Sequence, residues 1–261
     1  MILLFYAFAR EIAPFKKRLR NRAPLAIDGL QGFRATIAGK EFAVVGHGIG
    51  HRRATETARH AFDLVSGVEL VIGTGVVGAL SSGLMPGDLV LCDRVMMMGA
   101  NEQAVSEEHV RGAGRSLAMA EVQYSTGAIL TSDHVLANGA EKRRAKESSG
   151  AIAVDMESAA IAAEAAARGI PFFAIRAVLD EVDDEVVGAE MADEDGNVRP
   201  MAATSYLIRN PATMLKLPRM MRNLSRATAA IADALEAIAH DGKVPNSTKR
   251  DRGPAARKRP H

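Results

Sequence analysis

Three carboxylates and one arginine lie at or near the ends of two apolar runs, in a stretch where strand-like and helix-like sequence patterns alternate. Asp155 and Glu157 follow a short apolar run, and Arg176 and Asp180 lie in and just after a second one. We expect the ionised form at Glu157, because a helix start stabilises negative charge, and a partly protonated acid at Asp180, because it follows an apolar strand. Two carboxyls in different protonation states form a pair that acid catalysis uses. The alternative is that Glu157 only stabilises a helix and Asp180 is a solvated loop acid.

The elements that must position these residues are two strands and the helix between them. Residues 151–154 and 172–178 are short, continuously apolar runs, which are typical of strands buried on both faces of a parallel sheet. The Ala-rich segment 156–168 has high helix propensity and is stopped by Gly169 and Pro171. We therefore expect a βαβ unit, in which binding residues follow the strand ends.

The composition fits one α/β domain. The chain has 261 residues, of which 48% are hydrophobic, enough to bury a full core. No apolar run is long enough to cross a membrane, and residues 1–8 lack the positive lead and cleavage site of a signal peptide, so we expect a first strand there. Cys92 is the only cysteine, which fits a reducing cytoplasm, and the seven histidines show no metal-ligand spacing, so we expect no metal.

A glycine-rich run follows the next apolar segment. Gly73, Gly75 and Gly78 match the G-x-G-x-x-G pattern of dinucleotide-binding folds, and Asp93 falls at about the distance of a ribose-binding acid. That pattern needs a helix opening at its last glycines, whereas residues 81–88 would break any helix within a few residues. We therefore expect no nicotinamide or flavin site and no other cofactor.

The remaining elements are expected to alternate along the chain. A nucleophilic set of Ser132, Asp133 and His134 is disfavoured, because neighbours in an extended chain point to opposite faces. The glycine-rich turn 46–54 leads into a helix, an arrangement that suits an anion. We expect strands at 2–8, 33–37, 41–45, 68–72, 88–98 and 128–130, helices at 10–20, 54–65, 115–121, 140–147 and 225–239, and a loop at 101–112.

The C-terminal third has a different composition. Residues 211–226 interleave Met and Leu with Lys and Arg, which suits a helix lying on anionic lipid, although a core or subunit-interface helix is the alternative. Residues 241–261 hold seven basic residues against two acidic ones, and we expect a disordered basic tail. The expected organisation is a folded domain of residues 1–240, with an insertion at 181–223, followed by this tail.

Four motifs in the same order resemble the nucleoside phosphorylase and nucleosidase superfamily, which includes methylthioadenosine/S-adenosylhomocysteine nucleosidase. They are AFARE at 7–11, GHGIG at 46–50, TGVVGAL at 74–80, and VDME at 154–157 followed by RAVLD at 176–180. The likeness covers about residues 1–180 and resumes at the closing helix, and the last pair is its most specific part. It implies an α/β fold of three αβα layers with a mixed, partly barrelled central sheet, and a homodimer or higher homo-oligomer.

The resemblance also implies a role for each matching residue. It makes Asp180 the acid at purine N7 and places Glu11 where the nucleosidases keep their water-activating carboxylate. It assigns Glu157 to the ribose hydroxyls, Met156 to the sugar and Val135 to the base. The expected substrate-binding residues further include Asp155, Thr74, Gly75 and Val76, and the expected phosphate- or anion-binding residues are His47, Gly48, Arg52 and Arg53.

The implied chemistry agrees with the carboxylate pair. Cleaving a ribose–purine bond builds positive charge on the sugar and negative charge on the base, so a site must protonate the base and accept hydrogen bonds from the ribose. The nucleophile stays open. Val76 stands where phosphorylases commonly place a serine, which disfavours phosphate, and Glu11 favours water, but Thr74 and the expected anion-binding residues can compensate.

Within the superfamily the sequence looks most like the hopanoid-associated phosphorylases, which implies release of adenine from adenosylhopane in hopanoid biosynthesis. A basic, Met-rich flap in the insertion 181–223 could receive a long apolar 5′ substituent at a membrane surface. We therefore expect a cytoplasmic protein, with peripheral contact to the inner face of the cytoplasmic membrane as the further expectation.

Three other functions stay open. One is a soluble nucleosidase acting on methylthioadenosine, S-adenosylhomocysteine or futalosine, or a purine nucleoside phosphorylase. Another is a non-catalytic nucleoside-sensing protein. A nucleic-acid binder is disfavoured, because 3 Tyr, 8 Phe and no Trp provide few stacking platforms.

Overall fold

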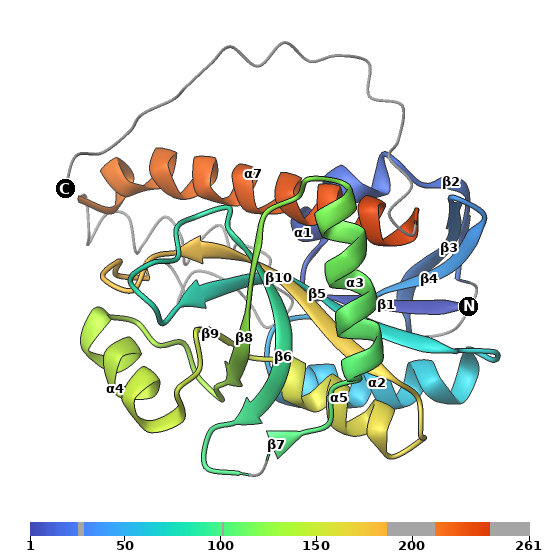
Figure 1. The fold of residues 1–261 in the computed structure, drawn as a ribbon, viewed down its shortest axis with the longest axis horizontal. Helices are drawn as coiled ribbons and strands as arrows, with labels where there is room; N and C mark the ends of the chain where they lie inside the picture. The colour runs from blue at the N-terminus through green and yellow to red at the C-terminus, as the bar shows by residue number, and fades with distance from the viewer. Residues whose placement is uncertain (26–28, 101, 187–211, 241–261) are drawn as a thin grey trace.

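A ten-stranded mixed sheet with helices on both faces forms the centre of the protein (Figure 1). The computed structural model describes residues 1–25, 29–100, 102–186 and 212–240, with side chains from residue 217 onward in the last range. The strands are β1 (Ile2–Tyr6), β2 (Arg20–Pro24), β3 (Gln31–Ile37), β4 (Lys40–Gly46), β5 (Leu70–Ala79), β6 (Leu89–Met97), β7 (Glu102–Gln103), β8 (Tyr124–Thr131), β9 (Ala153–Asp155) and β10 (Phe172–Asp180). The helices are α1 (Ala9–Lys16), α2 (His51–Leu64), α3 (Glu107–Met119), α4 (Gly139–Ser149), α5 (Ser158–Ala166) and α7 (Ala212–Ala239).

Part of the sheet closes on itself. The strand order is β10-β6-β8-β9-β5-β1-β4-β3-β2, and β10 also pairs with β5, so five strands form a closed ring. Closure removes the exposed edges that these strands would otherwise present. The expectation of an α/β fold with a mixed, partly barrelled sheet is confirmed.

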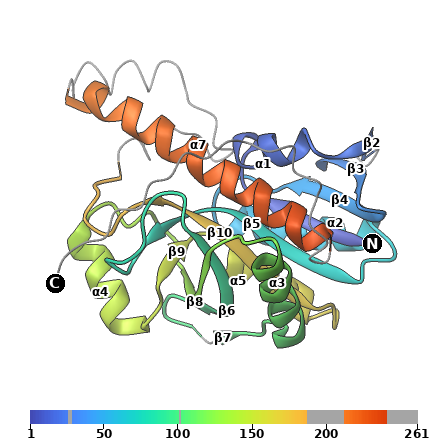
Figure 2. The ribbon, with the colours of Figure 1, turned by 45° about the horizontal axis from the view of Figure 1, so that its top comes forward.

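The core lies in two large clusters and a third, smaller one, and successive residues of a strand belong to different clusters because they point to opposite faces. Leu3 and Phe5 of β1 belong to the cluster that includes α2 and α5, and Leu4 belongs to the cluster that includes α1, α3 and α7. The long helix α7 crosses one face of the sheet, with α2 and α5 toward the other (Figures 1 and 2).

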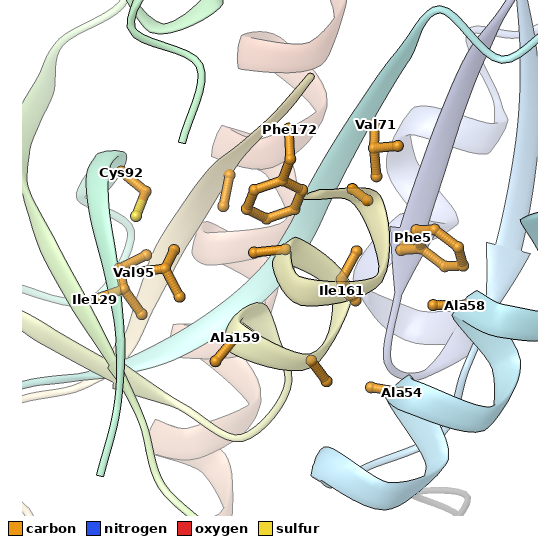
Figure 3. Close-up of a cluster of buried hydrophobic side chains, with 14 of the residues drawn as sticks. Phe5, Ala54, Ala58, Val71, Cys92, Val95, Ile129, Ala159, Ile161 and Phe172 are labelled. Atoms are coloured by element: carbon orange, nitrogen blue, oxygen red, sulfur yellow. The ribbon is translucent and has the colours of Figure 1, made fainter. Parts of the chain in front are cut away.

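Helix α5 is apolar almost all round, and most of its residues are buried. Figure 3 shows α5, with Ala159 and Ile161, between strands that carry Cys92 and Ile129 and the helix α2. Small alanines on both helices allow α2 and α5 to lie close together. The first turn of α5 is thereby held firmly against the barrel.

Several elements differ from the prediction. The hairpin of β3 and β4 and the helices α2 and α4 lie where expected. The expected loop at 101–112 instead contains β7 and the start of α3, and α1 ends at Lys16, before the expected end at residue 20, where the edge strand β2 begins. The glycine run Gly73–Gly78 lies inside β5, with no helix opening there, which agrees with the rejection of a dinucleotide fingerprint.

The expected parallel βαβ unit is wrong. β9 pairs antiparallel with β5 at Gly78 and Ala79, whereas β10 pairs parallel with the other edge of β5. The two strands joined by α5 therefore run in opposite directions. Strands inside a closed sheet are apolar in either direction, so the apolar runs could not reveal this.

The closing helix is longer than predicted. α7 begins at Ala212 and continues through Pro218 to Ala239, so residues 212–226 and the predicted helix at 225–239 form one element. Most of the insertion and the whole tail, residues 187–211 and 241–261, lie outside the described residues. Among the described residues, no helix combines the length and the hydrophobicity needed to cross a bilayer.

Candidate active site

A cavity of about 190 Å³ opens where β9 and β10 end. Both strand ends meet the same residue of β5, because Val154 and Asp180 each pair with Gly78. The cavity wall also contains residues of the β1–α1 turn, the segment after β8 and the start of α5. The predicted site residues that line the cavity are Glu11, Val76, Val135, Asp155, Met156, Glu157 and Asp180.

Two glycines of β5 make room for the charged side chains. A Cβ at Gly75 would lie 2.6 Å from Glu11 Oε1 and 2.7 Å from Arg176 Nη1, and Gly75 has φ +137°. A Cβ at Gly78 would lie 3.1 Å from Asp180 Oδ2. These glycines therefore serve the close approach of side chains to the strand, and this explains the pattern that resembled a dinucleotide fingerprint.

Glu11 is a buried carboxylate held by the backbone. Its Oε2 accepts hydrogen bonds from the N–H groups of Ala7 (2.7 Å) and Phe8 (3.1 Å), and its Oε1 accepts one from Val76 N–H (2.9 Å). Burial raises the pKa of Glu11, while these hydrogen bonds and the nearby Arg176 oppose the rise. Such a carboxylate can accept a proton from a water molecule in the cavity.

Asp155 and Arg176 form a buried ion pair in the wall of the barrel. Arg176 Nη2 lies 2.9 Å from Asp155 Oδ2, and both side chains are almost completely buried. Arg176 also donates to the Thr74 carbonyl (2.7 Å) and to Ser158 Oγ (2.8 Å). Asp155 Oδ1 accepts from Thr131 Oγ1 (2.8 Å) and from backbone N–H groups at the start of α5. Asp155 is thus committed to contacts within the protein.

Because Asp155 accepts the N–H groups at the start of α5, Glu157 makes no side-chain capping bond although it is the N-cap residue. Glu157 Oε1 instead accepts from Gly50 N–H (2.8 Å), and its side chain lines the cavity. Burial first, and the charge of Asp155 second, raise the pKa of Glu157 to about 7. The helix start was expected to favour the ionised form of Glu157, but desolvation and the neighbouring carboxylate shift its pKa in the opposite direction.

Asp180 is paired with Lys142, a residue that the sequence did not indicate. Lys142 Nζ donates to Asp180 Oδ2, and the lysine side chain is only 1% exposed. Burial raises the pKa of Asp180, in agreement with the expected desolvation, and Lys142 opposes that rise. Lys142 stands in a helix of mostly charged, exposed residues, so no periodicity distinguishes it from its neighbours.

The expected anion-binding residues do not line the cavity. Burial lowers the pKa of His47 to about 4, so its imidazole is neutral near pH 7. Gly48 N–H donates to the Ala7 carbonyl (3.1 Å), and Arg52 is exposed and pairs with Glu56. Within the described part of the chain, Arg53 is likewise not among the residues of the cavity wall.

Thr74 and Gly75 support the wall from behind. Thr74 is fully buried, and its hydroxyl donates to the Ile175 carbonyl (3.1 Å). In the disfavoured set, the side chains of the neighbours Asp133 and His134 do meet, with His134 Nδ1 2.5 Å from Asp133 Oδ1, whereas Ser132 Oγ accepts the backbone N–H of His134 (3.3 Å). Cys92 is buried, and desolvation raises its pKa to about 12, which disfavours a thiolate.

A second cavity of about 360 Å³ adjoins the first. It shares Leu179, Asp180 and Val186 with the first cavity, and Leu217 and Met220 of α7 border it. In the described residues, no three His, Cys, Asp or Glu side chains are grouped so that they could hold a metal ion. The two cavities together form a hollow whose chemistry is set by carboxylates and buried cations.

Comparisons with known proteins agree with this architecture. A family model described as the phosphorylase superfamily matches residues 2–205. A 5′-methylthioadenosine/S-adenosylhomocysteine nucleosidase of Staphylococcus aureus is 23% identical over 211 residues, which cover 74% of this chain and 91% of that protein. Futalosine hydrolase of Helicobacter pylori is 20% identical, with a TM-score of 0.68 over 91% of this chain and 96% of its own. A 5′-methylthioadenosine/S-adenosylhomocysteine nucleosidase of Campylobacter jejuni is 18% identical, with a TM-score of 0.72 over 92% and 98%.

Proposed function

The chain belongs to the phosphorylase superfamily, and from this premise we propose that it is a purine nucleosidase, which hydrolyses the N-glycosidic bond of an adenosine-type nucleoside. One observation carries the proposal. Carboxylates with two different cationic partners, Arg176 and Lys142, line one cavity at the ends of β9 and β10. Cleavage needs opposite electrostatic support for the two halves of the substrate.

The base side of the cavity comprises Asp180, Lys142 and Val135. The departing purine gathers negative charge and must receive a proton, which we assign to Asp180 acting at purine N7. Desolvation favours the protonated form of this carboxyl, and Lys142 stabilises the carboxylate that remains after proton transfer. Val135 lines the same cavity and offers an apolar surface for the base.

On the sugar side, Glu11, Asp155, Met156 and Glu157 line the cavity, and Arg176 lies behind them in the wall of the barrel. Three carboxyls face one guanidinium there, so positive charge that builds on the ribose is favoured. Glu157 is assigned to the ribose hydroxyls and Met156 to the sugar face. Asp155 is assigned to fixing the start of α5, because its oxygens already bind groups of the protein.

We assign water as the nucleophile. Glu11 occupies the Val76 N–H that an incoming anion would otherwise use, and its negative charge disfavours phosphate. Of the basic residues near the glycine-rich turn, Arg52 is exposed, and Arg176 is sealed in the barrel. Glu11 is placed to take the proton of the attacking water. Phosphorolysis is the alternative.

For the substrate, adenosylhopane is the specific prediction, and it rests on the sequence resemblance. Room for an apolar group exists in the second cavity, where Leu179, Val186, Leu217 and Met220 contribute side chains. The names of the relatives support a broader class, because they act on methylthioadenosine, S-adenosylhomocysteine or futalosine. A soluble nucleosidase for one of these compounds is therefore the competing assignment, and a non-catalytic nucleoside sensor is the other.

Contact with the cytoplasmic face of the membrane through the first half of α7 is also proposed. Met221 and Arg222 are exposed and support it, whereas Arg219 is paired with Glu181 and Asp184. The protein should float with liposomes that contain anionic lipid, and Arg222→Glu should reduce the bound fraction. No flotation of either protein would remove this proposal.

The decisive experiment measures adenine release from adenosine analogues with short or long apolar 5′ groups, with and without phosphate. A 5-substituted ribose that forms both with and without phosphate supports hydrolysis. A 5-substituted ribose 1-phosphate that forms only with phosphate supports phosphorolysis. Preference for the long 5′ group supports adenosylhopane. Binding without any adenine release would support the nucleoside sensor and overturn the enzymatic proposal.

A further inference from the structure

Lys142 is buried, unlike the other charged residues of helix α4. Of the eleven residues of α4, Lys142 and Ala145 are the buried ones. Removing an ammonium group from water costs several kcal/mol unless it is paired and hydrogen-bonded, so a buried lysine needs specific partners. Its partners all belong to β10 and the segment that follows it.

The three N–H donors of Lys142 have three acceptors. Its Nζ donates to the Asp180 carboxylate, to the Glu181 carbonyl (2.7 Å) and to the Asp184 carbonyl (3.2 Å). One ammonium therefore binds both the side chain of the proposed acid and the backbone that carries it. Helix α4, which lies at the end of the molecule away from the N-terminus, is in this way joined to the cavity (Figures 1 and 2).

Other basic residues hold the same segment from outside. Arg143 pairs with Asp183, and Arg219 pairs with Glu181 (2.9 Å) and Asp184 (3.1 Å). These side chains are partly or largely exposed, and exposed pairs contribute little. Lys142 is thus the buried anchor of the segment, and Arg143, its neighbour in sequence, offers a matched control.

The role of Lys142 rests on the proposed function. We propose that Lys142 is a positioning residue for purine cleavage: its ammonium aims the Asp180 carboxyl at the base and sets the upper pH limit at which Asp180 still carries its proton. The proton leaves Asp180 for purine N7, and Lys142 remains an ammonium that stabilises the resulting carboxylate. Lys142 thereby favours transfer of the proton to the base. It also lowers the pH up to which Asp180 stays protonated.

The surroundings of Asp180 define the sign of the effect. Lys142 opposes the burial-driven rise in the pKa of Asp180, and Asp184 adds to that rise. Losing Lys142 should therefore move the alkaline limb of the activity profile to higher pH. The other charged or titratable residues around the two cavities are Glu11, His134, Asp155, Glu157, Asp183, Glu185 and Arg219.

The test compares kcat and KM across pH for the wild type, Lys142→Met, Lys142→Arg and Arg143→Met. Misplacing the acid should lower kcat by about 10²-fold in Lys142→Met, with a smaller change in KM and an upward shift of the alkaline limb. Lys142→Arg should keep the limb near its wild-type position, and Arg143→Met should resemble the wild type. A loss of kcat with an unmoved limb, or no loss at all, would overturn the proposal.

A second measurement does not depend on turnover. NMR titration of ¹³C-labelled aspartate carboxyls, with Asp180→Asn used for assignment, should show Asp180 titrating at higher pH in Lys142→Met. Lys142→Gln provides the same comparison if Lys142→Met does not fold. An unchanged titration overturns the role of Lys142. A normal shift in a protein that releases no adenine from any analogue overturns the proposed function alone.

Discussion

On the sugar side of the cavity one guanidinium, Arg176, faces three carboxyls, whereas on the base side one ammonium, Lys142, holds one carboxylate, Asp180. Both cations are almost completely buried. Arg176 binds Asp155, a backbone carbonyl and a serine, all within the protein, so it stiffens the barrel. Lys142 reaches the carboxyl that faces the cavity.

This difference matches the charges that bond cleavage produces. Burial raises the pKa of Glu11 and Glu157, and the charge of Asp155 adds to the rise at Glu157. The sugar side also has one cation for three carboxyls, which is a shortage of positive charge. A ribose that becomes positive would relieve this shortage. On the base side, the Lys142 ammonium has no ionised partner while Asp180 carries its proton, and the pair becomes balanced one to one once the proton has passed to the base. Electrostatic preorganisation of this kind requires no rearrangement during the reaction.

The largest expected effect comes from removing the acid on the base side. Asp180→Asn keeps the size of the side chain but cannot donate a carboxyl proton, so adenine release should fall by about 10² to 10⁴-fold. Steady-state assays with the best analogue measure this change, and circular dichroism checks that the fold is intact.

Asp183→Asn is the matched control for this prediction. Asp183 stands three residues away, is largely exposed and pairs with Arg143. Its activity should stay close to that of the wild type. Full activity in Asp180→Asn would show that the base side does not work through an acid, and the contrast between the two sides would lose its chemical meaning.

A somewhat smaller effect is expected on the sugar side, where stability is the sensitive quantity. Arg176→Met leaves Asp155 buried without its ionic partner, and breaking such a pair costs about 3–5 kcal/mol. Urea unfolding measures the loss. Adding Asp155→Asn should recover part of it, because the unpaired charge is then gone. A loss below about 1 kcal/mol, the range of an exposed pair such as that of Arg143, would contradict a structural role for Arg176.

The sequence indicated the residues of the cavity better than the topology that joins them. Glu11, Glu157 and Asp180 were named from motifs and Val135 from the family resemblance, and they all line one cavity. Their catalytic roles stay predictions. Motif residues are readable because their type is unusual at a strand end, whereas the direction of a buried strand leaves no mark on its composition.

Lys142 and the start of α3 show what local patterns miss. Lys142 is one of several basic residues in α4, and only its contacts with the segment after β10 make it special. Helix α3 begins at Glu107 with polar residues, so a search for apolar periodicity places its start too late. Glu157 was judged by the helix start alone, although burial and Asp155 dominate its ionisation.

The smallest expected effect concerns the pH dependence of stability. The pKa of Glu157 is raised from 4.5 to about 7 in the folded chain. Below the unfolded value both states bind the proton, and this stability is fully present. It is lost as pH rises through the folded pKa, with a slope of at most about 1.4 kcal/mol per pH unit. Glu157→Gln keeps an oxygen for Gly50 N–H but has no proton to lose, so this slope should disappear from urea unfolding curves.

Glu164 provides the opposite case on the same helix. Its pKa is lowered by Arg59 and Arg168, so its stabilisation is present above the unfolded value and lost as pH falls. Glu164→Gln should therefore weaken the protein near neutral pH, where Glu157→Gln strengthens it relative to the wild type. Glu164 lies seven residues after Glu157, about 10 Å along the helix at 1.5 Å per residue. A buried carboxyl without a cationic partner and a paired carboxyl must respond oppositely to pH. If both variants changed the pH dependence in the same direction, the shortage of positive charge would not be specific to the sugar side.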